Sequence, residues 1–206
     1  GYCIQIYCDF SGYSDMAIGI ALLLGFKIPM NFNAPLTADS MTDFWRRWHI
    51  SLSTWIRDYV YISLGGNKKG TLRMYFNQMV AMTACGLWHG ASLNFVVWGV
   101  LHGALVCVHK FWSQTVLKHD RRYHPSGIRR FLSVFISFHV LCFTWLFFRC
   151  KDFDSVWIMV KQLFTKVNPS VLPDVFMGYK YVFMLMIFAL LTHWIPDSWQ
   201  NRCVRV

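Results

Sequence analysis

The stretch LWHGASLNFVVWGVLHG, residues 87–103, lies inside a long run without charged residues. No Asp, Glu, Lys or Arg occurs between Arg73 and Lys110, so three histidines are the only ionisable interruptions in the 36 residues 74–109, apart from cysteine and tyrosine. A straight helix of that length would measure roughly 54 Å at about 1.5 Å per residue, whereas the hydrocarbon core of a bilayer is about 30 Å thick. We therefore predict a break near residues 86–90, between two membrane elements or within one re-entrant segment, and His89 lies at this break.

The composition is that of an integral membrane protein. The chain has 206 residues, of which 55% are hydrophobic and 18% aromatic, and the apolar residues form long uncharged runs such as 131–148 and the shorter 181–195. We predict an all-α, polytopic transmembrane protein with interfacial and broken or re-entrant helices. The first residue is not Met and the opening run already has the character of mid-domain sequence, so we expect a fragment of a larger fold. Residues 1–206 are interpreted as a single domain, with a motif-bearing core at 1–108 and C-terminal spans with a basic loop at 109–206.

The net charge of +10 has a membrane explanation. In a soluble protein such an excess would suggest a nucleic-acid partner, but here six Lys and Arg residues gather in the loop 110–130 beside the single acid Asp120. Basic loops of this kind usually face the cytoplasm. We therefore predict a multi-pass protein with membrane lipid as a partner, a cytoplasmic 110–130 loop and no nucleic-acid partner.

Two acids interrupt the apolar opening segment 1–26. Asp9 and Asp15 flank Ser11 and Gly12, and an unpaired carboxylate in a membrane run is costly. We expect a helix break at this position, with the acids facing a polar cavity or an arginine.

Residues 40–63, SMTDFWRRWHISLSTWIRDYVYIS, have the periodicity of one amphipathic helix suited to the membrane interface. Ser40 and Asp43 resemble a capping box at its start. His49 lies on the border between an arginine-bearing face and an apolar face, whose members are Phe44, Trp45, Trp48, Leu52, Trp55, Ile56 and Tyr59. The following LGGNKKG, residues 64–70, predicts a turn that returns the chain toward the long apolar run. His49 and His89 therefore come from two elements joined by one tight connection.

At these residues the chain resembles the membrane-bound O-acyltransferases, in particular their bacterial alginate O-acetyltransferase type. The resemblance covers about half of the chain, in YCDFSGYSDMAIGIALLLGF (7–26), NFNAPLTADSMTDFWRRWHISLSTWIRDYVYISLGGNKKG (31–70) and the opening LWHG stretch (87–103). It implies that His89 is the catalytic residue and that His49 is a second functional histidine. The LGGNKKG turn looks more like the polysaccharide-acetylating branch than the branch that moves D-alanine onto teichoic acid.

The resemblance implies an enzyme of the cell inner (plasma) membrane. Such an enzyme takes an acetyl group from a cytoplasmic thioester donor, acetyl-CoA or an acyl carrier, with no bound cofactor. It passes the group toward hydroxyls of an extracellular polysaccharide such as alginate, or to a periplasmic or extracellular partner acyltransferase. Imidazole is the usual base for deprotonating a hydroxyl near neutral pH, which suits His89. We expect substrate or donor binding by a further set of residues: Trp88, Arg46, Arg47, Trp48, Arg57 and Asn67.

Several alternatives stay open at this point. The arginines could instead bind anionic lipid head groups. The acyl group could be D-alanyl or another acyl for a cell-envelope polymer, and the chain could be a transporter half or a catalytically inactive scaffold. His102 lies 13 residues beyond His89 and is interpreted as structural. No HxxxH, HExxH or GxSxG pattern occurs, so no metal site and no serine hydrolase are predicted.

Overall fold

The computed structural model describes residues 1–120, 123–166 and 168–195, and this part of the chain contains helices and no strand. Arg121 and Arg122 of the predicted basic loop, and Cys203, lie outside the described residues. The principal α-helices are α1 (Tyr2–Leu23), α2 (Met41–Arg47), α3 (Ile50–Trp55), α4 (Thr71–His89), α5 (Leu93–Lys110), α6 (Gly127–Arg149), α7 (Phe153–Thr165), α8 (Leu172–Gly178) and α9 (Lys180–Thr192). Short 3-10 segments are η1 (Pro35–Thr37) and η4 (Pro169–Val171), and π-helical segments are η2 (Ile56–Tyr61) and η3 (Phe111–Val116).

Two of the described helices are long and apolar enough to cross a membrane. They are Leu93–Val116, which joins α5 to η3, and Gly127–Arg149, which is α6. A third candidate is the pair Pro169–Gly178 and Lys180–Thr192, which is bent by 81°. The predicted multi-pass, all-α class is confirmed. The run 181–195 indeed needs its flanking residues to approach the length of a span.

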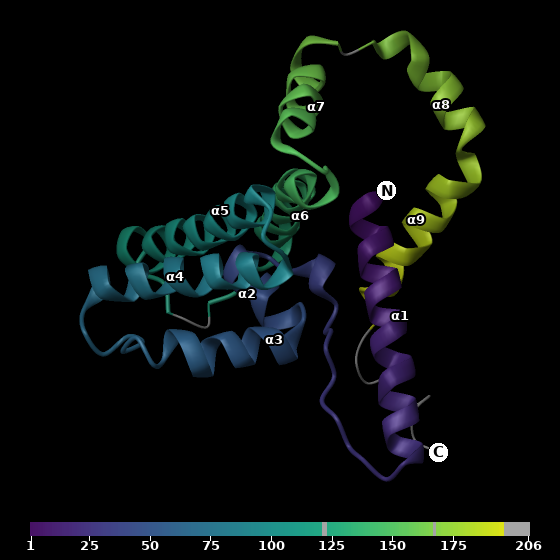
Figure 1. Cartoon of the computed structure of the whole chain (residues 1–206). Coiled ribbons are helices and arrows are strands. Elements are labelled where there is room, and N and C mark those ends of the chain that lie inside the picture. Colours follow the sequence, from purple (N-terminus) through teal and green to yellow (C-terminus); the bar gives the residue numbers. More distant parts are fainter. Residues whose placement is uncertain (121–122, 167, 196–206) are drawn as a thin grey trace.

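The break in the long apolar run is confirmed at the predicted place. Helix α4 ends at His89, Gly90 is extended with φ of 155°, and α5 begins at Leu93 with the Ser92 hydroxyl accepting from the Asn94 amide. Helices α4 and α5 then lie side by side (Figure 1). Their backbones touch, because a Cβ on Gly86 would lie 2.2 Å from the Phe95 carbonyl oxygen. The hairpin therefore requires glycine at the contact.

The segment 40–63 is not the single helix predicted. Helix α2 ends at Arg47, and His49 adopts left-handed backbone angles of φ 44° and ψ 54° before α3 starts. The cause lies in another segment: the Asn31 carbonyl accepts from the Ile50 amide, and the Asn31 side chain accepts from the Ser51 amide at 3.1 Å. Asn31 thus satisfies the free N–H groups of a new helix start, which a helical wheel of 40–63 does not reveal.

Two smaller predictions about caps and acids are partly wrong. The Ser40 hydroxyl does accept from the Asp43 amide, but the Asp43 carboxylate bonds to Arg47 Nε at 2.8 Å and does not complete a capping box. Helix α1 runs without a break through Ser11 and Gly12, because its helical backbone is continuous from Tyr2 to Leu23. Asp15 nevertheless lines a polar cavity, as expected, whereas Asp9 does not.

The core forms where α2, α5 and α6 meet. Phe44, Trp98 and Trp145 are almost completely buried there. His102 of α5 is fully buried and bonded at both ring nitrogens: Trp45 Nε1 donates to Nδ1 at 3.2 Å, and Nε2 lies 2.9 Å from the Thr144 hydroxyl. Since the Thr144 hydroxyl donates to a backbone carbonyl, His102 Nε2–H is the donor in this pair. His102 is a structural residue, as predicted.

Candidate active site

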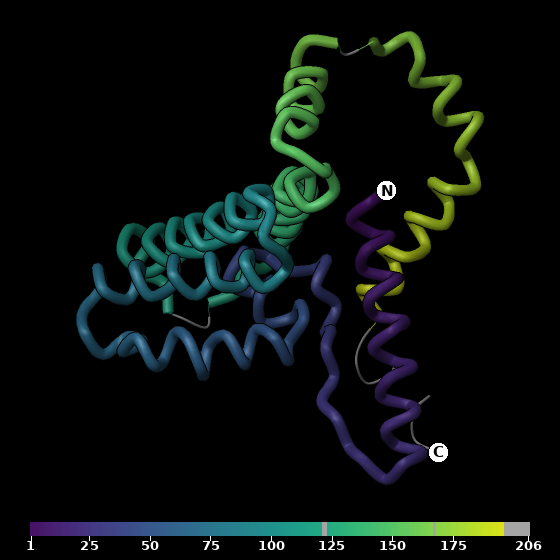
Figure 2. The backbone as a smooth tube through the Cα atoms, viewed as in Figure 1, coloured from purple at the N-terminus to yellow at the C-terminus, as the bar shows by residue number. Residues whose placement is uncertain are grey.

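The two histidines meet because two segments of the chain run antiparallel. From His49 the chain follows α3 and η2 outward, turns at residues 64–70 and returns along α4 to His89 (Figure 2). Helix α4 packs directly on η2. The Asn77 side chain of α4 donates to the Gly66 carbonyl at 3.0 Å and holds the turn. The start of α3 and the end of α4 therefore lie at the same end of the pair, as the tight connection predicted.

His49 and His89 both contact the indole ring of Trp88. The His49 ring lies edge-on to Trp88 with centroids 5.9 Å apart, and Trp88 lies 4.9 Å from its neighbour His89. Phe10 of α1 contacts the other side of His49 at 4.7 Å. Both imidazoles are half-buried.

The His89 imidazole is enclosed by aromatic rings. Trp98 lies 5.3 Å from it and Phe148 5.0 Å, both nearly perpendicular to its plane, and Phe95 is 6.2 Å away. Within the described part of the chain, no hydrogen bond to either ring nitrogen of His89 is found. Other histidines of apolar segments are anchored: His139 Nδ1 donates to Phe135, and His193 Nδ1 donates to Ala189, each to a backbone carbonyl at 2.8 Å. His89 thus lacks the hydrogen bond to a backbone carbonyl that a histidine with only a structural role in an apolar helix is expected to make.

Burial sets the protonation of the pair. His49 and His89 lie outside the two helices that meet the length and composition of a membrane span. Burial, with a smaller contribution from nearby His89, lowers the pKa of His49 to about 4. Burial also lowers the pKa of His89. Both rings are therefore uncharged at neutral pH, and each has one nitrogen able to accept a proton.

A cavity lies along η2 and α4. It measures about 360 Å³ and follows η2 and α4 toward the histidines, reaching Ser53, one turn from His49, and Cys85, one turn from His89. Its walls include apolar side chains such as Ile56, Met82 and Val106. Three of the predicted binding residues, Arg46, Arg57 and Asn67, line this cavity together with Lys110.

The other predicted binding residues are placed differently. Arg47 is paired with Asp43 and donates to the Asn33 carbonyl at 3.4 Å, so it fastens the loop before α2. Trp48 is buried and stacks on Phe44 with centroids 5.6 Å apart, which makes it a core residue. Trp88, in contrast, lies between the histidines and is more than half exposed.

Sequence reasoning missed residues that come from distant segments. Asn31 holds the His49 loop: its side-chain oxygen accepts from the Ser51 hydroxyl at 2.7 Å, and that hydroxyl lies 3.4 Å from His49 Nδ1. Phe148 reaches His89 from the far end of α6. No local pattern marks either residue, although Asn31 lies in the stretch that resembles the acyltransferases.

One group of the described residues places potential metal-ligand atoms close together. Atoms of Asp39, Asp43 and His124 lie within 4.8 Å of one another. They already have partners, since Asp39 bonds to His124 at 2.6 Å and Asp43 to Arg47. The absence of a metal site thus stays a prediction from the sequence.

A helical membrane protein in which two breaks between helices bring together a pair of uncharged, half-buried histidines has groups suited to proton transfer in acyl transfer. Comparison with known proteins gives the family: the sequence profile of the membrane-bound O-acyltransferase family matches residues 2–159, and the chain belongs to this family.

The relatives carry names that differ in acyl group and acceptor. A probable alginate O-acetylase of Azotobacter vinelandii is 46% identical over 80% of this chain and 31% of its own length. A peptidoglycan O-acetyltransferase of Helicobacter pylori is 42% identical over 79% of this chain and 30% of its own length. A teichoic acid D-alanyltransferase of Bacillus subtilis is 33% identical over 74% of this chain and 40% of its own length. The chain spans about a third of the length of the first two relatives.

Proposed function

We propose that the protein transfers an acetyl group from a thioester donor to a hydroxyl of an extracellular polysaccharide, with His89 as general base. The observation that carries the proposal is the state of His89. Its ring is uncharged, enclosed by aromatic side chains, not bonded within the described part of the chain, and adjacent to a second uncharged histidine. The relatives named as O-acetyl-transferring enzymes support the acetyl group and the polysaccharide acceptor.

The chemistry needs one proton acceptor and one bond exchange. His89 takes the proton of the acceptor hydroxyl while the hydroxyl oxygen attacks the thioester carbonyl carbon. The tetrahedral oxyanion collapses, the carbon–sulfur bond breaks, and the departing sulfur takes the proton back from His89 as a thiol. Acceptor alcohol and thioester thus become ester and thiol, and the enzyme is regenerated. A positioned base contributes typically about 10² to 10⁴-fold to such a rate.

His49 has a different role in this scheme. Because its pKa is about 4, it is not an imidazolium at neutral pH. The Ser51 hydroxyl donates to the Asn31 side-chain oxygen, so the single N–H of the neutral His49 ring, at Nδ1, is the donor toward the Ser51 oxygen at 3.4 Å. His49 Nε2 is then a hydrogen-bond acceptor, which can orient the acceptor hydroxyl beside His89.

The cavity along η2 and α4 fits the donor. Arg46 and Lys110 would meet phosphates of coenzyme A or of a carrier-bound arm, and the apolar walls would accept the arm itself. Arg57 also lines the cavity, but its charge is balanced by Asp58 at 2.7 Å. Because the cavity ends one turn from both histidines, the thioester would be brought to their side. Trp88 would cover the reacting group. The donor is a substrate, and no bound cofactor is required.

We place the protein in the cell inner membrane, as a multi-pass protein with the donor on the cytoplasmic side. The acetyl group then leaves on the other side, for an extracellular polysaccharide or for a periplasmic or extracellular partner acyltransferase. The two span candidates support the multi-pass membrane protein, and the name of the Azotobacter vinelandii relative supports a polysaccharide acceptor.

The experiment compares wild type with His89→Ala and His49→Ala in the full-length protein in its native membrane. Membrane levels are measured by immunoblotting, and the O-acetyl content of the secreted polymer by mass spectrometry. His139→Ala is the control, because His139 is also a histidine of an apolar helix but is bonded to a backbone carbonyl. We expect acetyl content to fall at least about 100-fold in His89→Ala and to stay normal in His139→Ala. Normal acetylation in His89→Ala would refute the role of this residue.

A further inference from the structure

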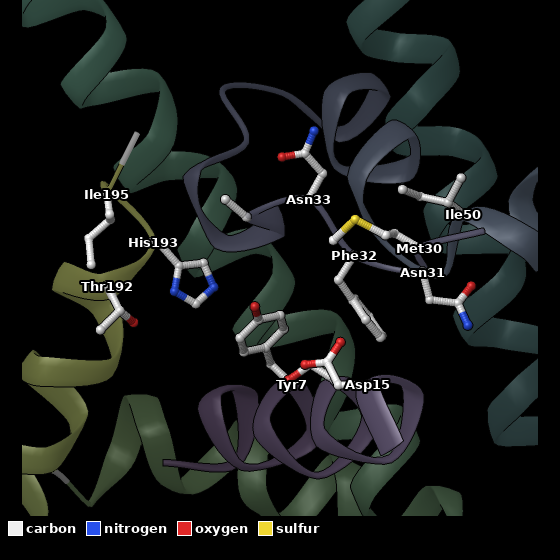
Figure 3. A pocket seen from close by; sticks show the side chains of 12 residues that line it. Tyr7, Asp15, Met30, Asn31, Phe32, Asn33, Ile50, Thr192, His193 and Ile195 are labelled. Atoms are coloured by element: carbon white, nitrogen blue, oxygen red, sulfur yellow. The ribbon is translucent and has the colours of Figure 1, made fainter. Parts of the chain in front are cut away.

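A polar cavity borders Ile50, the residue after His49, and shares no lining residue with the donor cavity. It measures about 530 Å³, within the range of about 300–1,000 Å³ typical of small-molecule sites. Figure 3 shows that Tyr7 and Asp15 enter it from α1, Asn31 and Asn33 from the loop before α2, and His193 from the end of α9. Elements from both ends of the described chain therefore build one site.

The cavity is joined to the candidate active site through backbone and side-chain contacts. Ile50, the residue after His49, lines it. Asn31 lines it too, and accepts from the amide of Ile50 and from the Ser51 hydroxyl that approaches the His49 ring. A molecule in this cavity would lie beside Asn31 and Ile50, next to the backbone of His49.

The lining favours a neutral, hydroxyl-rich ligand over an anion. The Asn33 amide and the Asp15 carboxylate are available for hydrogen bonds, and the described lining residues include no Lys or Arg. The nearby Arg47 donates to the Asn33 carbonyl, but its charge is balanced by Asp43. A carboxylate without a balancing cation repels a second negative charge. The cationic donor cavity has the opposite character.

A buried acceptor in the wall of the cavity is without a partner. His193 is 8% exposed, and its Nδ1–H donates to the Ala189 carbonyl, so in the neutral ring Nε2 is an acceptor. Among the described residues this nitrogen finds no donor. The Tyr7 ring lies 4.5 Å from the His193 ring and borders the same cavity. A hydroxyl that moves in beside Tyr7 would supply the missing hydrogen bond, which points to a donor-bearing ligand.

We propose that this cavity binds the acceptor, and that it takes an uncharged sugar unit in preference to a uronate. That the bound sugar is the acetyl acceptor rests on the proposed function, whereas the site itself and its preference for an uncharged sugar follow from the lining residues. Asp15 determines the specificity by accepting hydrogen bonds from sugar hydroxyls and repelling carboxylates. His193 Nε2 accepts from one further hydroxyl.

The test measures binding in the absence of any acyl donor, so that it does not depend on catalysis. Full-length protein, purified in detergent, is titrated with fluorescently labelled hexasaccharides of glucose and of a uronic acid. Wild type is compared with Asp15→Asn, and with Asp9→Asn as the matched control, because Asp9 is an exposed acid of the same helix outside the cavity. His193→Phe keeps an aromatic ring against Tyr7 and removes the acceptor.

We expect wild type to bind the neutral probe more tightly than the uronate. Asp15→Asn should lower the ratio of the uronate to the neutral dissociation constant by about fivefold, which is the effect of removing one charge repulsion at about 4 Å in water. Asp9→Asn should leave the ratio unchanged, and His193→Phe should weaken binding of the neutral probe.

Tighter binding of the uronate by wild type would overturn the proposal, as would an unchanged ratio in Asp15→Asn. Undetectable binding of both probes would also overturn it. A protein that binds the neutral probe as expected but transfers no acetyl group to it would leave the site intact and refute the proposed function instead.

Discussion

The imidazole of His49 lies edge-on to the indole of Trp88, with ring centroids 5.9 Å apart and an angle of 70° between the planes. Because Trp88 directly precedes His89, this contact joins the break between α2 and α3 to the break between α4 and α5. Two interruptions of helical structure, 40 positions apart in the chain, thus form one candidate site.

The left-handed backbone of His49 predicts different costs for different substitutions. An alanine in this conformation costs roughly 1–2 kcal/mol, whereas glycine and asparagine adopt it more readily. We expect His49→Ala, His49→Gly and His49→Asn all to lose acetyl transfer, and the melting temperature of the alanine variant to be the lowest. Thermal unfolding in detergent and O-acetyl content would be measured together. Full activity in His49→Asn would show that His49 only shapes the backbone.

The depressed pKa values predict the pH dependence of the reaction. A base is active when it is unprotonated, so lowering the pKa of His89 moves the acidic loss of kcat/KM below pH 6.5, the usual value for histidine. We expect the decline in rate on acidification to be centred below pH 6.5. Trp88→Ala should expose both rings and shift the decline upward, whereas the control Trp55→Ala, at an exposed tryptophan, should not. A decline centred at or above pH 6.5 in wild type would contradict the assignment.

The contact between α4 and α5 predicts that Gly99→Ala is destabilising. The new Cβ would lie 2.4 Å from the Met82 carbonyl oxygen, so the helices must move apart. Forcing extra atoms into a tight contact costs about 1–3 kcal/mol. Gly19→Ala in α1 is the control, since its Cβ would meet nothing within 4 Å. We expect a lower melting temperature for the first variant alone, and equal melting temperatures would disprove the close packing.

The cationic donor cavity predicts an effect of Arg46→Gln on donor affinity. Losing one attraction between a cation and a phosphate at about 4 Å in water corresponds to about fivefold. We expect KM for the thioester to rise by about that factor with little change in kcat. Arg73→Gln is the control, because Arg73 is exposed at the start of α4, outside this cavity. If both variants changed KM equally, the effect would be a general one of surface charge.

Much of the site's outline could be predicted from local sequence. The uncharged run 74–109 exceeds the thickness of a bilayer, so a break had to occur, and His89 lies at it. The Ser40 cap, the turn at 64–70 and the apolar runs of α5 and α6 are likewise local features, since each depends on neighbouring residues.

Tertiary structure decided the rest. Whether 40–63 continues as one helix depends on Asn31, which offers hydrogen-bond acceptors to α3 from a separate loop. The lining of the polar cavity that contains Asp15 depends on α9 lying beside α1, which brings His193 to Tyr7 across almost the whole chain. The sequence by itself determined the interruption near His89, because the length of the uncharged run depends on local residues alone. Only the packing of distant segments decided the interruption at His49 and the contacts around both histidines, because their hydrogen bonds and ring contacts join residues that no periodic pattern relates.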